Sequence, residues 1–96
     1  DENAYINDHI YMFGGAVVNG KIELLCDRAI GAIYEWFGKN TTIASEEGKM
    51  VAYIKADEQS IAYWALQYAE LVKVLSPLSV VTKIKTLIET LKNNYD

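Results

Sequence analysis

Residues 50–68 read MVAYIKADEQSIAYWALQY and join the pattern of a strand to the pattern of a helix. Residues 50–56 predict a strand in which neither face is clearly polar. Asp57 is a residue type that caps helices, and it precedes a helix predicted over residues 58–69. The apolar face of this helix follows the i, i+3, i+4, i+7 spacing, at Ile61, Trp64, Ala65 and Tyr68.

On the N-terminal side, the strand has a neighbour with which it can form a hairpin. Residues 41–45 predict that second strand, and the polar turn 46–49 (EEGK) contains the glycine that a hairpin loop favours. Farther upstream, residues 28–37 predict a helix that Asp27 caps and Gly38 ends. The apolar stripe of that helix is predicted at Ile30, Ile33, Trp36 and Phe37.

A first strand is predicted between residues 16 and 27, because side chains of apolar character recur at every second position from Ile22 to Cys26. The pair Asn19-Gly20 is typical of tight turns and leaves two interpretations open. Either the segment folds back on itself at this pair, or one strand begins after it. In both cases we expect Cys26 to be an inert core thiol.

On the C-terminal side, residues 71–75 predict a short strand, and Ser76-Pro77 predicts the start of a last helix that runs to about residue 93. The order of elements is therefore β-α-β-β-α-β, followed by a helix. This order predicts an α+β domain over residues 16–96 of the ferredoxin-like kind, with four antiparallel strands and two helices on one face. Residues 1–15 predict a connector with a short helix that ends at Gly14-Gly15.

Composition limits what such a domain can do. The 96 residues suit one domain, and a hydrophobic fraction of 51% argues against disorder. The net charge is −4, and one of the nine basic residues is arginine, which argues against a surface dedicated to duplex DNA. A single cysteine and a single histidine predict no internal disulfide and no metal site, and we expect no cofactor and no catalytic activity.

Three residues are candidates for contact with a ligand or partner. Arg28 follows a strand at the start of a helix, where a guanidinium and backbone N–H groups can meet an anion, although an exposed arginine near acidic neighbours is the commoner case. Tyr63 and Gln67 lie one turn apart with polar tips, on a face beside the predicted core, although a solvated face is the simpler interpretation. Trp64 and Tyr68 have the spacing of core residues rather than of a base-stacking surface.

Four segments in this order resemble a known family: IYEWFG (33–38), IAYWALQY (61–68), VLSP (74–77) and LIETLKNNY (87–95). They are similar to the C-terminal extension (WCX) domain that follows the WYL domain in bacterial transcriptional regulators. The resemblance covers about residues 4–96, and residues 1–15 resemble the connector from a preceding WYL domain. The chain lacks the winged-helix and WYL domains of such regulators.

The resemblance implies a noncatalytic module for effector response and dimerisation. It implies a homodimer, contact with DNA through the missing winged-helix domain, and a nucleotide or single-stranded nucleic acid as effector. No run of 18 apolar residues is present, so we expect no membrane partner. The chain starts at Asp1 without a signal segment, and we expect a piece of a longer cytoplasmic protein. The alternatives are a stand-alone small-molecule sensor and an acylphosphatase-like enzyme. For the enzyme, a glycine-rich phosphate loop is missing at residues 24–27.

Overall fold

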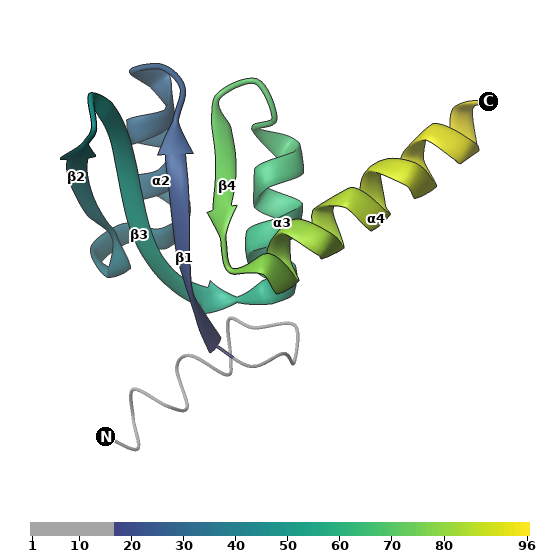
Figure 1. Cartoon of the computed structure of the whole chain (residues 1–96), viewed down its shortest axis with the longest axis horizontal. Coiled ribbons are helices and arrows are strands. Elements are labelled where there is room, and N and C mark those ends of the chain that lie inside the picture. The colour runs from purple at the N-terminus through teal and green to yellow at the C-terminus, as the bar shows by residue number, and fades with distance from the viewer. Residues whose placement is uncertain (1–16) are drawn as a thin grey trace.

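The computed structural model describes residues 17–96 and shows a single sheet with helices packed on it (Figure 1). A short 3-10 turn, η1 (Gly38–Asn40), follows the first described helix. The main elements in chain order are β1 (Val17–Leu24), α2 (Arg28–Phe37), β2 (Thr42–Glu46), β3 (Lys49–Asp57), α3 (Glu58–Gln67), β4 (Val72–Ser76) and α4 (Leu78–Tyr95).

The sheet has four strands in the order β2-β3-β1-β4, and every neighbouring pair is antiparallel. Helices α2 and α3 lie behind the same face of this sheet in Figure 1, and the other face is turned toward the viewer. The predicted α+β class with an antiparallel four-stranded sheet is confirmed. The predicted connector helix within residues 1–15 lies outside the described residues.

The core lies between the sheet and helices α2 and α3. The side chain of Ile22 on β1 is fully buried, opposite Ala52 on β3 and Val74 on β4. Trp64 of α3 is 1% exposed, and its ring forms a T-shaped pair with the Phe37 ring, with the two centroids 5.1 Å apart. The prediction that Trp36 faces the core was wrong, because its side chain is 52% exposed, while the adjacent Phe37 packs on Trp64.

The pair Asn19-Gly20 forms no turn, and β1 continues through it opposite β3. Both interpretations of this pair were therefore wrong. A Cβ atom on Gly20 would lie 3.2 Å from Cγ1 of Ile54 and 3.2 Å from Cδ1 of Ile61. Glycine at this position thus allows the core side chains of Ile54 and Ile61 to approach the backbone of β1 closely.

The two aspartates that precede helices behave differently. Asp57 has an extended backbone (φ −76°, ψ 157°), and its Oδ2 accepts a hydrogen bond from the Ser60 N–H over 3.1 Å, as predicted for a cap. Asp27 instead has helical angles (φ −61°, ψ −32°) and forms no side-chain cap, so that prediction was wrong. Cys26 lies after the end of β1 and is exposed, which contradicts the predicted core thiol.

Candidate functional site

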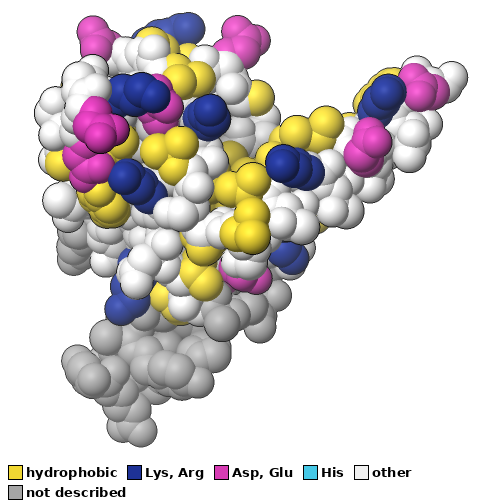
Figure 2. Space-filling view, in the orientation of Figure 1, with side chains coloured by type: hydrophobic (Ala, Val, Ile, Leu, Met, Phe, Trp, Pro, Cys, Tyr) yellow, Lys and Arg dark blue, Asp and Glu magenta, His cyan; other side chains and the backbone are white. Residues whose placement is uncertain are grey.

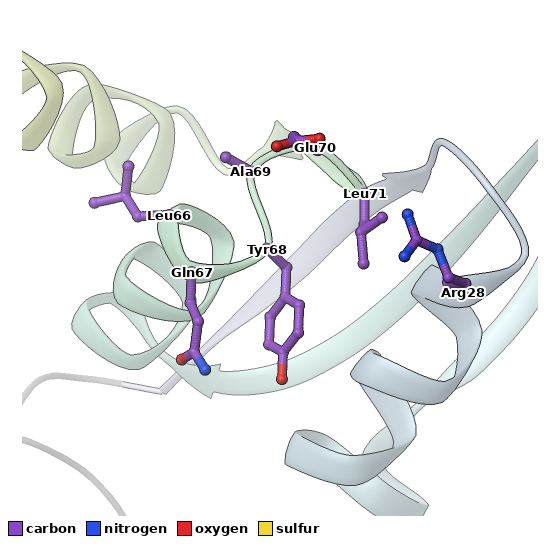
Figure 3. A pocket seen from close by; sticks show the side chains of 7 residues that line it. All are labelled: Arg28, Leu66, Gln67, Tyr68, Ala69, Glu70 and Leu71. Atoms are coloured by element: carbon purple, nitrogen blue, oxygen red, sulfur yellow. The ribbon is translucent and has the colours of Figure 1, made fainter.

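A pocket of about 360 Å³ lies where α2 begins and α3 ends. Figure 3 shows Arg28 extending from the first turn of α2 on one side, with Gln67 and Tyr68 on the other side. The turn from α3 to β4 closes the remaining wall. The complete lining is Arg28, Leu66, Gln67, Tyr68, Ala69, Glu70 and Leu71.

Backbone hydrogen bonds hold the walls of this pocket together. The Tyr68 N–H donates to the Trp64 carbonyl over 3.1 Å and ends α3, and the Leu71 N–H donates to the Tyr68 carbonyl over 2.8 Å. The Leu25 N–H then donates to the Leu71 carbonyl over 2.8 Å. This last bond ties the loop that precedes α2 to the turn that follows α3, so the two sides of the pocket are fixed relative to each other.

The Tyr68 side chain is half-buried and connects the pocket to the core. Its ring packs on Trp64 with centroids 5.6 Å apart and an interplanar angle of 46°. The phenol is thereby oriented by a fully buried neighbour while its hydroxyl end remains at the pocket (Figure 3). The sequence predicted Tyr68 as a core residue, and the half-buried ring that lines a pocket is a role that helical spacing alone does not distinguish.

The pocket offers groups for both signs of charge. The Arg28 guanidinium carries five N–H donors that suit a carboxylate or phosphate, and the Gln67 amide can donate or accept. The Glu70 carboxylate adds an acceptor for an ammonium or hydroxyl group. Leu66 and Leu71 supply apolar surface, so the pocket has the composition of a small polar ligand site.

Two of the three candidate residues meet in this pocket. Arg28 and Gln67 come from different helices and both line it, whereas Tyr63 lies outside the lining with a side chain that is 46% exposed. Fewer backbone N–H groups at the start of α2 are available to bind an anion beside Arg28 than the sequence predicted. The N–H groups of Ala29 and Ile30 donate to the carbonyls of Cys26 and Asp27, each over 3.1 Å.

A second polar cluster lies on the sheet face opposite the helices, and no local sequence pattern indicates it. Lys21 Nζ lies 2.9 Å from Glu46 Oε1, the Tyr53 hydroxyl donates to Glu46 Oε2, and Lys21 Nζ lies 5.8 Å from the centre of the Tyr53 ring. The hydrogen bond from Tyr53, and then the bond from Lys21, lower the pKa of Glu46. The bond to Glu46 raises the pKa of Lys21 and of Tyr53. The three residues come from β1, β2 and β3, so only the strand order brings them together.

We predict that Glu46→Gln lowers the free energy of unfolding slightly at neutral pH, and that this difference disappears in acid. A carboxyl whose pKa is lowered by folding stabilises the fold above its unfolded pKa, near 4.5, and loses that effect as the pH falls through the folded pKa. The effect is small because the cluster is exposed. Urea denaturation at several pH values measures it. Glu47→Gln in the adjoining turn makes the same change in net charge, and an identical pH profile for both variants would contradict the prediction.

No family model and no curated protein matches this chain. None of the helices described here combines the length and the apolar character needed to cross a membrane. Within residues 17–96, no group of three or more His, Cys, Asp or Glu side chains is arranged to hold a metal ion.

Proposed function

We propose that this chain is a noncatalytic regulatory module of a bacterial WYL-type transcriptional regulator, and that it responds to a small effector. The four motifs that resemble the WCX domain support this proposal, together with the pocket between α2 and α3. The observation that carries it is that Arg28 and Gln67, far apart in the sequence, line one pocket that a backbone hydrogen bond holds together.

The fold of the module is proposed to be ferredoxin-like. The strand order β2-β3-β1-β4 places β1 and β3 at the centre, which is the order that two split β-α-β units produce. In this arrangement α2 and α3 pack on one face, and the turn after α3 lies beside the start of α2. The effector pocket is therefore a product of the topology rather than of one motif.

In the complete regulator, the winged-helix domain would bind DNA and this module would alter the conformation or assembly of the dimer. The single arginine and the net charge of −4 support the proposal that duplex DNA is bound by the winged-helix domain and not by this module. A nucleotide fits the pocket chemically, because Arg28 can pair with phosphate and Gln67 and Tyr68 can meet polar base or sugar groups. We propose a cytoplasmic location and a homodimer on the basis of the resemblance.

Binding measurements on the 96-residue chain test the effector site. We expect mononucleotides or short single-stranded DNA to bind in calorimetric titrations, and Arg28→Ala to weaken binding by roughly ten-fold, because a charge-assisted hydrogen bond contributes about 1.5–3 kcal/mol. Gln67→Ala should weaken it less. Lys55→Ala, an exposed lysine on β3, is the control. Binding that Arg28→Ala and Gln67→Ala both leave unchanged would refute the site.

One observation favours a second candidate, a stand-alone sensor of small zwitterions. Arg28 and Glu70 place opposite charges around the same pocket, which suits a ligand with a carboxylate and an ammonium group, such as an amino acid. Glu70→Gln separates the candidates. It should weaken the binding of an amino acid, because the carboxylate that pairs with its ammonium group is lost. It should leave the binding of a phosphate ligand unchanged or make it tighter, since a nearby negative charge is removed.

A further inference from the structure

Helix α4 begins on the body of the domain and then leaves it. Its first turns pack against the core through Val80, which is fully buried, and through the half-buried Val81, Ile84 and Leu87. From Ile88 onward every residue is exposed. Figure 1 shows the second half of α4 projecting away from the sheet and from α3.

The apolar stripe of α4 does not stop where the contact with the body stops. Ile84, Ile88, Leu91 and Tyr95 follow at i, i+4, i+7 and i+11, which keeps them on one helix face. Ile88 is 49% exposed, Leu91 47% and Tyr95 88%. An exposed stripe at the spacing of helix-pairing residues, continuous with a buried one, is the pattern that a partner helix covers.

A groove of about 320 Å³ continues this stripe toward the body. One wall comes from α4, with Val81, Ile84 and Ile88, and the facing wall includes Ala65 and Ala69 from the side of α3. The small alanine side chains leave room for the side chains of a third element. The groove gives the stripe a shaped second wall at its inner end, which a flat membrane surface would leave unfilled.

Lysines border the stripe on both sides. Lys85 and Lys92 are one residue beyond Ile84 and Leu91 and share one border, and Lys83 lies on the other border. Glu89 is the neighbour of Lys85 and Lys92 on the helix surface but lies farther from the stripe than either lysine. Figure 2 shows basic, acidic and apolar side chains along the projecting helix. Two copies of α4 packed on these stripes would bring lysines together, which opposes self-pairing and favours an occupant with acidic borders.

We propose that the α4 stripe, defined as Ile84, Ile88, Leu91 and Tyr95, docks an amphipathic helix of another protein whose apolar face is flanked by Asp and Glu. The inner end of that helix enters the groove between α4 and α3, and its acidic residues pair with Lys85 and Lys92. The α4 stripe shares no residue with the Arg28 pocket, and the groove at its inner end meets that pocket's lining at Leu66 and Ala69. Docking on the stripe does not require the effector.

The test uses two designed peptides of about 21 residues with leucine at heptad positions a and d. One has glutamate at positions e and g and the other has lysine. Fluorescence anisotropy with the 96-residue chain should show roughly ten-fold tighter binding of the acidic peptide at low salt, and a smaller preference at high salt. Lys85→Glu with Lys92→Glu should reverse the preference. Ile88→Ser with Leu91→Ser should weaken binding roughly ten-fold or more.

Controls separate this proposal from the effector site. Thr86 and Thr90 lie on the opposite face of α4, so the double variant Thr86→Ala, Thr90→Ala should leave peptide binding unchanged. Arg28→Ala should also leave it unchanged. Equal binding of both peptides would overturn the proposal. So would a homodimer in light scattering that Leu91→Ser and Tyr95→Ser dissociate, or binding to anionic vesicles that the acidic peptide does not displace. If the 96-residue chain binds the acidic peptide but binds no nucleotide, the result would count against the proposed function and not against this proposal.

Discussion

Trp64→Ala is expected to lower the free energy of unfolding by about 3–5 kcal/mol, the range for truncating a large buried aromatic side chain. The indole is 1% exposed and lies between the rings of Phe37 and Tyr68. A small domain typically has a free energy of unfolding of about 5–15 kcal/mol, so the variant should be close to unfolding. Urea denaturation followed by circular dichroism measures the change. Because Tyr68 rests on this indole, binding in the Arg28 pocket should also weaken.

Trp64→Phe is the matched control, and we expect it to cost much less, about 1–2 kcal/mol. The Trp64 Nε1–H is buried and has no hydrogen-bond partner among the described residues. Phenylalanine leaves a smaller cavity than alanine and removes this unpaired donor, so part of the loss is offset. A cost for Trp64→Phe as large as that for Trp64→Ala would contradict this account and would show that the indole N–H is satisfied in solution.

The core residues of an element were predictable where a single periodic pattern in the sequence determines that element. The helical spacing of Ile61, Trp64 and Ala65 matched their burial in α3, and Asp57 caps that helix as its residue type predicts. The failures occurred where one residue type has two physical uses. Glycine at position 20 serves a close approach instead of a turn, and Asp27 precedes a helix without capping it. For Gly20, the side chains that decide its use, Ile54 and Ile61, lie far away in the sequence.

The arginine and the amide of the candidate site were predictable, whereas its carboxylate, Glu70, and its shape were not. Arg28 was selected for its place after a strand, and Gln67 for its place on a helix face, and both line the pocket. Their common location depends on the turn that joins α3 to β4 and on its bond to Leu25, which no local pattern indicates. The cluster of Lys21, Glu46 and Tyr53 was missed for the same reason, because its members lie on three different strands.

Ile22→Ala is the second substitution with a large expected effect, a loss of about 2–5 kcal/mol in the free energy of unfolding. Ile22 is fully buried on β1, which pairs with both β3 and β4. It lies in a cross-strand row with Ala52 on one side and Val74 on the other. Ala52 is already small and cannot expand into the space, so the cavity should persist and the cost should fall in the upper half of this range. Guanidinium denaturation measures it.

Two further variants define what the loss means. Ile22→Val removes one methylene at the same position and should cost about 0.5–1.5 kcal/mol, in proportion to the volume lost. Lys55→Ala on the exposed side of β3 should change stability by about 0.5 kcal/mol or less. If Ile22→Ala cost no more than Ile22→Val, neighbouring side chains would have to fill the cavity. The strands beside β1 would then have to shift toward the cavity. That would be unexpected, because β1 is a central strand paired on both edges, and such strands have the least freedom to move.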